Sequence, residues 1–162
     1  MTPPALKRPN LPKPAFVDEL TKRVAHVALV AHTRLYETTN GAIGQSFLGA
    51  PCLLLTTTGA KTGAKRTLPL GYAKTGVTYV LAASNAGSDR NPGWFANLVK
   101  NDQVDVQVGA ERFSAKAAVL RRGDPDYDRL FGLINEGFGG RYYRYQEKTS
   151  RPIPLVVLTP AD

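Results

Sequence analysis

The chain has 162 residues, and 43% of them are apolar, which is enough for one domain with a proper core and gives no reason to expect a second. Its net charge of +8 favours an anionic partner, such as nucleic acid, a membrane surface or a phosphorylated small molecule. Cys52 is the only cysteine, so an intrachain disulfide is excluded and we expect a buried, inert thiol.

Residues 1–14 contain five prolines and lack the apolar stretch that is typical of a secretory signal. Because proline has no backbone N–H and fixes φ, this segment cannot be helical, and we expect an extended or disordered arm. No later stretch of the sequence is apolar for long enough to span a membrane. These features predict a cytoplasmic protein whose single domain covers residues 15–162.

A helix is predicted over residues 15–40. Six apolar residues recur at spacings of four, four, three, four and four and form one stripe: Phe16, Leu20, Val24, Val27, Ala31 and Leu35. We expect the stripe to pack on the core; the alternatives are a partner subunit and a membrane surface that faces Lys22 and Arg23. His26 and His32 lie about 120° apart around this helix, so they do not share a metal, and no metal site is predicted.

An apolar run, residues 53–58, leads into a short loop that is rich in glycine and positive charge. Gly59 and Gly63 allow backbone N–H groups to turn toward a ligand. Three cations, with no acidic residue before position 70, follow the first glycine: Lys61, Lys65 and Arg66. The loop is predicted to be an anion cradle on a hairpin, with a solvated basic turn as the alternative. It is not a Walker A loop, because three residues rather than four separate the glycines.

The rest of the chain predicts short strands with helices at the joints. Strands are expected at 67–74, 77–84, 103–108, 111–120 and 153–158, and short helices after Asn91-Pro92 and after Asp124-Pro125. Asn91 is the expected N-cap of the first of these helices. About six strands without βαβ alternation favour a mainly β, antiparallel barrel.

Three stretches carry a more specific pattern. They are Thr56-Thr57-Thr58-Gly59-x-Lys61-Thr62-Gly63-x-x-Arg66-x-x-Pro69-Leu70, Ser84-x-x-Gly87-x-x-x-x-Pro92-x-Trp94-x-x-Asn97-Leu98, and Tyr142-x-x-Tyr145-Gln146-x-x-Thr149-x-Arg151-x-Ile153-Pro154. Together, and in this order, they resemble the deazaflavin-dependent nitroreductase family, whose enzymes use coenzyme F420. The resemblance implies a six-stranded split β-barrel, similar to the FMN-binding one, that holds reduced deazaflavin for hydride transfer to a quinone, enone or nitroaromatic.

The resemblance also implies roles for residues. The basic hairpin would hold the phosphate and oligoglutamate tail of the coenzyme, and the segments near positions 84 and 94 would line its ring. The implied cofactor-binding residues are Ala60, Lys61, Thr62, Lys65, Arg66, Thr67, Leu68, Pro69, Leu70, Gly71, Ala82, Ala83, Ser84, Asn85, Gly93, Trp94, Phe95, Ala96, Asn97 and Tyr142. Ser84, Tyr142 and Tyr145 are the expected donors of a hydrogen bond or proton to the acceptor oxygen. Relatives commonly have an arginine, an aromatic residue and a lysine where Ala60, Gly71 and Asn85 stand.

The alternatives to a reductase that uses F420 are a non-catalytic carrier of F420 or another anionic ligand and a reductase that uses FMN. A nucleic-acid binder is disfavoured, because the excess positive charge is gathered in one loop. The expected partner is a small apolar acceptor, and peripheral contact with a membrane through the N-terminal helix is a further expectation. The sequence is compatible with a monomer and with a homodimer.

Overall fold

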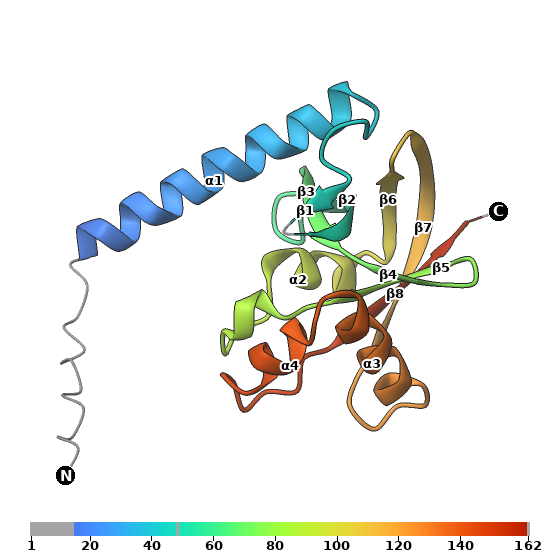
Figure 1. The fold of residues 1–162 in the computed structure, drawn as a ribbon. Helices are drawn as coiled ribbons and strands as arrows, with labels where there is room; N and C mark the ends of the chain where they lie inside the picture. Colours follow the sequence, from blue (N-terminus) through green and yellow to red (C-terminus); the bar gives the residue numbers. More distant parts are fainter. Residues whose placement is uncertain (1–14, 48, 162) are drawn as a thin grey trace, which may run out of the picture.

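The computed structural model describes residues 15–47 and 49–161, and the proline-rich arm predicted at 1–14 lies outside the described residues. Figure 1 shows a curved sheet with helices at its ends. The elements in chain order are α1 (Ala15–Thr38), β1 (Ser46–Phe47), β2 (Ala50–Thr58), β3 (Lys65–Gly71), β4 (Ala73–Thr75), β5 (Thr78–Ala82), the single 3-10 turn η1 (Asn85–Gly87), α2 (Gly93–Lys100), β6 (Gln103–Val108), β7 (Glu111–Leu120), α3 (Tyr127–Gly137), α4 (Arg141–Gln146) and β8 (Leu155–Pro160).

All neighbouring strands pair antiparallel. The strand order is β1-β2-β6-β7-β8-β5-β4, with β3 paired to β2, which makes eight strands within the described residues. Two strands were not expected. The strand predicted at 67–74 divides into β3 and β4 on either side of Tyr72, and β1, with only two residues, was too short to be predicted. The predicted mainly β, antiparallel fold is confirmed.

Among the described residues the core forms three clusters, the smallest of which consists of Tyr36, Cys52 and Leu54. On one face of the sheet, Leu53 of β2 and Val104 of β6 pack with Leu98 of α2. On the other side, Ile134 of α3 and Leu155 of β8 belong to a second cluster. Side chains alternate along each strand, so neighbouring residues contribute to different clusters and the helices at both ends are tied to one sheet.

The β6–β7 hairpin and the start of α2 test two of the local predictions. The hairpin of β6 and β7 has the predicted bounds, with Gly109 at φ +59° in its turn. The N-cap prediction for α2 is wrong by one residue, because Pro92 occupies the cap. The side chain of Asn91 has another partner: its Oδ1 accepts a hydrogen bond from Nη1 of Arg151 at 2.8 Å.

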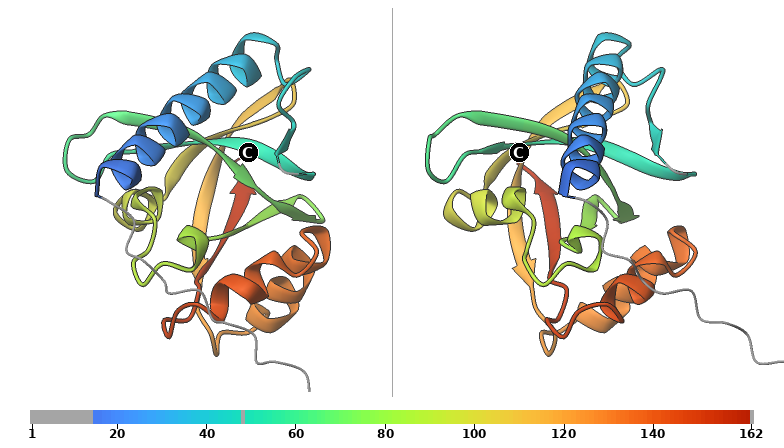
Figure 2. Two further views of the ribbon diagram at one scale, coloured as in Figure 1. Left: turned by 60° about the vertical axis from the view of Figure 1, so that its left-hand side comes forward. Right: turned by 90° about the vertical axis from the view of Figure 1, so that its left-hand side faces the viewer.

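The C-terminal half of α1 is fixed to the sheet, whereas its N-terminal half extends outward (Figures 1 and 2). The anchor is the fully buried Tyr36, whose hydroxyl donates to the carbonyl of Cys52 at 3.1 Å and accepts from the N–H of Gly109 at 2.8 Å. Cys52 is buried, as predicted, and burial raises the pKa of its thiol to about 11.

The apolar stripe of α1 does not pack on the core, contrary to the prediction. Its described large side chains, Leu20, Val24, Val27 and Leu35, are 44–66% exposed, and Ala31 is exposed too. Thr33 and Tyr36, on the other side of the helix, are the buried residues. The stripe has the predicted helical spacing but faces solvent, because another side of α1 lies against β3 and includes Leu29, Val30 and Thr33. No helix in the described part of the chain is long and apolar enough to cross a membrane.

Candidate active site

A cleft runs from the β2–β3 hairpin, past α2, to α4. Its first part has a volume of about 500 Å³ and lies between β3 and the start of α2. Its second part, of about 320 Å³, lies between β3, the end of β5 and α4. The two parts share four lining residues, Leu68, Asn85, Pro92 and Trp94, so they form one elongated site.

Arg66 gives the hairpin end of the cleft its positive charge. Its side chain is exposed and lines the first part together with Asn91 and Asn97. Among the described residues, neither Arg66 nor Lys61 forms an ion pair with an acidic side chain. These two cations therefore remain available for an anionic ligand.

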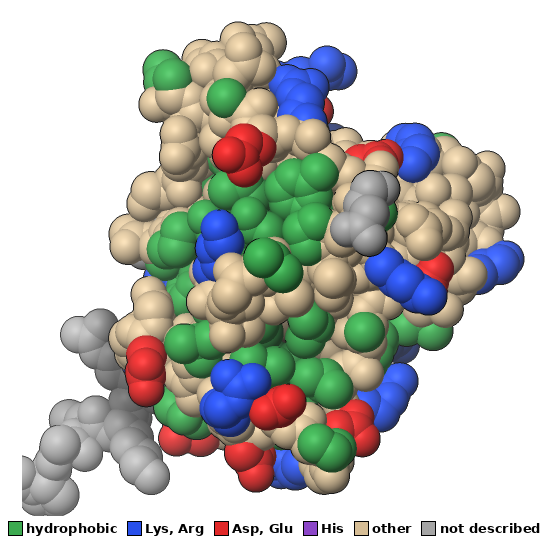
Figure 3. All heavy atoms as spheres, turned by 90° about the vertical axis from the view of Figure 1, so that its right-hand side faces the viewer, with side chains coloured by type: hydrophobic (Ala, Val, Ile, Leu, Met, Phe, Trp, Pro, Cys, Tyr) green, Lys and Arg blue, Asp and Glu red, His purple; other side chains and the backbone are tan. Residues whose placement is uncertain are grey.

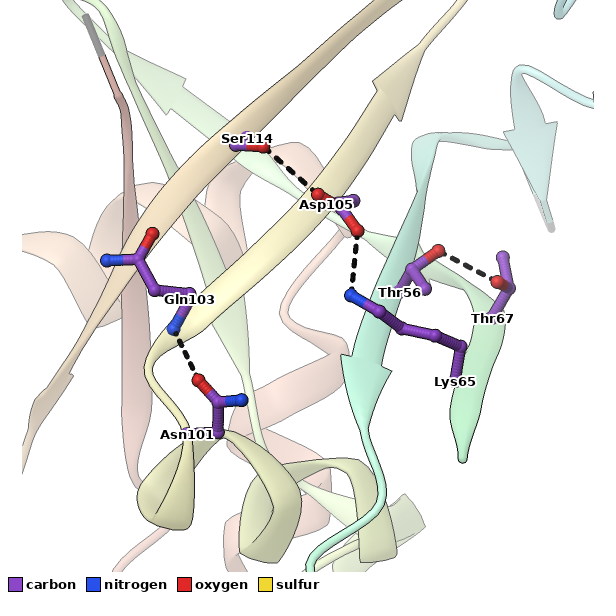
Figure 4. A network of polar contacts seen from close by, with 7 residues as sticks. All are labelled: Thr56, Lys65, Thr67, Asn101, Gln103, Asp105 and Ser114. Atoms are coloured by element: carbon purple, nitrogen blue, oxygen red, sulfur yellow. Dashed lines mark hydrogen bonds and ion pairs between the residues drawn. The ribbon is translucent and has the colours of Figure 1, made fainter. Parts of the chain in front are cut away.

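Lys65 differs from its neighbour, because it is engaged with an acidic residue. Its Nζ lies 3.0 Å from Oδ2 of Asp105 on β6, and Ser114 donates to the other carboxylate oxygen at 3.0 Å (Figure 4). These hydrogen bonds hold the pKa of Asp105 below its usual value, with that from Lys65 as the largest cause. Lys65 lines neither part of the cleft, since its side chain crosses β2 to reach β6.

The backbone of the basic loop offers fewer donors than the sequence suggested. The N–H of Ala60 donates to Oδ1 of Asn97 at 2.9 Å, and the N–H groups of Gly59 and Gly63 close the loop on itself. Asn97 also donates to Oγ1 of Thr57 at 3.0 Å, which ties the loop to α2. The expected cradle of free amides is thus largely occupied by internal hydrogen bonds, which leaves the exposed side chains of Lys61 and Arg66 as its positive groups.

The loop after β5 forms the middle of the cleft and has an unusual backbone. Asn85 and Ala86 have φ values of +46° and +54°, which are costly for a residue with a side chain. Gly87 follows at φ +83°, and a β-carbon there would lie 2.6 Å from the carbonyl oxygen of Tyr145. Ser84 is buried, and its hydroxyl does not cap η1 although it lines the cleft.

Aromatic side chains wall the far end of the cleft. Tyr142 and Tyr145, on α4, have ring centroids 6.0 Å apart and both line the second part. Phe138, at the end of α3, continues the row, with its ring centroid 5.3 Å from that of Tyr142. Burial raises the pKa of the Tyr142 phenol to about 12, so this group keeps its proton at neutral pH.

The structure brings most of the predicted residues to one cleft. The residues that line it are Arg66, Thr67, Leu68, Pro69, Leu70, Gly71, Ala82, Ser84, Asn85, Gly93, Trp94, Asn97, Tyr142 and Tyr145. Six others do not line it: Ala60, Lys61, Thr62, Lys65, Ala83 and Ala96. Phe95 does not line it either, because it is 4% exposed and packs in the inner core.

Sequence reasoning missed three features of this site. Phe138 and Arg141 line the second part, and Arg151 holds the middle loop from outside. A single aromatic residue among the glycines at 137–140 was the only local signal for Phe138. Arg151 belonged to the third sequence pattern, but the partners of its guanidinium lie 60 or more residues away in the sequence.

Comparisons with known proteins agree on one family. The sequence profile of the F420H(2)-dependent quinone reductases matches residues 29–160. An F420H(2)-dependent quinone reductase of Mycobacterium tuberculosis is 48% identical over 141 residues, which are 86% of this chain and 95% of that protein. A solved F420-H2 dependent reductase, FDR-A, has a TM-score of 0.61 and 34% identity, with 67% of this chain and 93% of that chain covered. Another solved structure, described as a domain-swapped dimer, has a TM-score of 0.63 and 32% identity, with 88% and 96% covered.

Proposed function

The chain belongs to the F420H2-dependent quinone reductase family and is therefore an oxidoreductase with coenzyme F420 as its cofactor, and we propose that it reduces quinones within the cleft described above. The observation that carries the proposal is the polarity of that cleft, which is cationic at the hairpin and aromatic at α4. A molecule with an anionic tail and a flat ring system matches both ends.

The residues of the cleft fit the coenzyme in chemistry and in order. Arg66, with Lys61 beside the cleft, would bind the phosphate and carboxylates of the tail by charge-assisted hydrogen bonds. Leu68, Pro69 and Trp94 present apolar surface on which a ring can lie. The bound, reduced coenzyme supplies a hydride, and the chain's task is to orient the acceptor and stabilise the charge that develops on it.

The acceptor end of the cleft has hydroxyl groups and a cation. Tyr142, Tyr145 and Ser84 line it, as does Arg141. A quinone that accepts a hydride develops negative charge on an oxygen, and a phenol O–H directed at that oxygen would stabilise it and could give up the proton that completes reduction. The apolar walls exclude water around the quinone ring, which strengthens such hydrogen bonds.

Turnover separates the reductase from its alternatives. We expect F420H2 oxidation by the purified protein in the presence of menadione, and tighter binding of F420 than of FMN. F420 binding without turnover of menadione or p-benzoquinone would favour the carrier. Preferential FMN binding would overturn the assignment of the basic end to the coenzyme tail.

A matched pair of variants tests the basic end. Arg66→Ala should weaken F420 binding by roughly tenfold or more, since a hydrogen bond to a charged group contributes about 1.5–3 kcal/mol. Lys65→Ala removes the same charge from the same strand but should change the dissociation constant less than about threefold. The Arg66 effect should shrink in high salt. Fluorescence titration measures the F420 dissociation constants of both variants. If the two substitutions weaken binding equally, the basic end attracts the tail by its net charge alone and Arg66 makes no specific contact.

The proposed oligomeric state is a homodimer in which a second copy covers the apolar stripe of α1. The stripe is exposed on a helix that extends from the domain. Figure 3 shows a separate group of hydrophobic side chains on another face of the molecule, away from the outer end of α1. Large exposed apolar areas favour a protein partner. The spacing of Leu20, Val24, Val27 and Ala31 is typical of helix-to-helix packing. A relative described as a domain-swapped dimer, which aligns over 88% of this chain, supports this choice.

The dimer is tested by charge on the stripe. The double variant Val24→Glu, Val27→Glu should be a monomer by light scattering at concentrations where the wild type is a dimer. Ala25→Glu adds a charge to another side of the same helix and should leave the dimer intact. A monomeric wild type that sediments with anionic vesicles, and loses this binding in the double variant, would assign the stripe to a membrane surface instead.

A further inference from the structure

The acceptor end of the cleft is closed by a residue that the sequence patterns did not include. Phe138 follows α3 and is 7% exposed, and its ring lines the second part of the cleft beside Tyr142 and Tyr145. Arg141 lies on the same ring, with its guanidinium carbon 5.5 Å from the ring centroid. Phe138 and Arg141 therefore line the acceptor end of the cleft together, with the guanidinium beside the ring.

The ring of Phe138 also lies directly against the backbone of β3. A β-carbon at Gly71 would be 2.5 Å from both Cε1 and Cζ of Phe138 and 3.3 Å from the hydroxyl of Tyr142. Side chains in proteins do not approach to 2.5 Å, so the ring occupies the space that a side chain at position 71 would need. Gly71 lies in a strand without a positive φ, so room for this ring, rather than backbone freedom, accounts for the glycine.

Buried hydrogen bonds hold Phe138 in place from behind. Asn135 is 1% exposed, and its carbonyl accepts from the N–H of Phe138 at 3.1 Å and from that of Gly140 at 2.8 Å. The side chain of Asn135 bridges the two helices, since it donates to the carbonyl of Phe131 and accepts from the N–H of Tyr143. These hydrogen bonds fix the backbone that carries the ring of Phe138.

We propose that Phe138 determines acceptor specificity by setting the width of the cleft at Gly71, which restricts the enzyme to flat quinones with few ring substituents. This inference rests on the proposed function and names the substrate class of the same site. A rigid ring rejects added methyl groups on a quinone more strongly than it affects the unsubstituted ring, because a close-packed wall has no spare volume.

Two quinones that share a core provide the test: p-benzoquinone and duroquinone, its tetramethyl derivative. Phe138→Ala should raise the ratio of kcat/KM for duroquinone to that for p-benzoquinone by about tenfold or more relative to the wild type. Tyr143→Ala is the matched control, because this neighbouring aromatic is half exposed and lines neither part of the cleft, so the ratio should stay unchanged.

A second pair of variants tests the contact itself. Gly71→Ala should displace the ring and lower kcat/KM for p-benzoquinone in the wild-type background, and the same change should have little effect when Phe138 is already alanine. Titration with F420 and thermal unfolding check that each variant is folded and loaded, with Phe138→Leu as the milder replacement. An unchanged quinone ratio in folded Phe138→Ala, or additive effects of the two changes, would overturn this inference alone. Failure of the wild type to oxidise F420H2 with p-benzoquinone would instead overturn the proposed function.

Discussion

Arg151→Ala should weaken F420 binding by roughly tenfold to a hundredfold and lower the free energy of unfolding by about 2–4 kcal/mol. The guanidinium of Arg151 is a clamp on the loop after β5. Its Nε donates to the carbonyl of Ser88 and its Nη2 to that of Ser84, both at 2.8 Å, and Nη1 donates to Oδ1 of Asn91 at 2.8 Å. Three parts of one loop thus share one planar donor.

The clamp opposes strain in that loop. Asn85 and Ala86 both have positive φ, and left-handed backbone at such residues costs about 1–3 kcal/mol each unless the surroundings hold it. Without Arg151 the carbonyls of Ser84 and Ser88 lose their charged partner, and the loop can relax away from the conformation that lines the cleft. Both F420 affinity and the placement of Ser84 depend on it, so kcat should fall along with affinity.

Arg151→Lys and Arg144→Ala separate the clamp from a general effect of charge. Lysine keeps the charge but cannot donate from three fixed directions, so Arg151→Lys should behave almost like the alanine variant. Arg144 also donates to a carbonyl, that of Gly139 at 2.8 Å, but lies outside the cleft, and its alanine variant should bind F420 normally. Affinities are measured well below the unfolding temperature of each variant. Normal F420 binding by Arg151→Lys would mean that charge alone, rather than the fork of donors, holds the loop.

The sequence sufficed for features that depend on local pattern. The β6–β7 hairpin follows from alternating apolar residues around a glycine that must adopt a positive φ, and its bounds were predicted correctly. Three sequence stretches also predicted the residues of the cleft, most of which converge on it. Their roles in binding and catalysis remain the subject of the variants described above.

The features that escaped prediction depend on contacts distant in sequence. The charge of Lys65 is engaged by Asp105, 40 residues away, and the width of the cleft depends on Phe138 against Gly71. The α1 stripe has a clear helical period, but a period gives the side of a helix and not what covers it. Such contacts follow from how the sheet curves and how α3 and α4 pack on it, which no local pattern encodes.

The two tyrosines of α4 differ in their surroundings, and this difference bears on which of them serves as a proton donor. Tyr142 is 7% exposed, and burial raises the pKa of its phenol to about 12. Loss of the phenol proton would remove the hydrogen-bond donor, and it begins only as the pH approaches that value. Titration of Tyr142 should therefore cause no fall of kcat/KM near pH 10. Tyr145 is half buried and closer to solvent, which could replace a transferred proton.

Tyr145→Phe, and to a smaller extent Tyr142→Phe, should lower kcat by roughly tenfold to a hundredfold, which corresponds to about 1.4–2.7 kcal/mol of barrier. The change removes only an oxygen, so the ring contact at 6.0 Å between the two residues and the shape of the wall remain. A hydrogen bond made only as charge develops on the quinone lowers the barrier without tightening substrate binding. Its loss should therefore reduce kcat and kcat/KM together and leave KM and F420 affinity nearly unchanged.

Tyr143→Phe is the control, because Tyr143 lies between the two on α4 but packs on Phe131 outside the cleft, with ring centroids 5.4 Å apart. Steady-state kinetics with menadione and one enone, with F420H2 in excess, compares the three variants with the wild type. If the rings of Tyr142 and Tyr145 only wall the pocket, their phenylalanine variants should match Tyr143→Phe, and the proton would then come from Ser84 or from solvent. A loss of kcat with both acceptors, confined to the two cleft residues, would identify a phenol as the group that stabilises the developing oxyanion, because an enone and a quinone share that charge and little else.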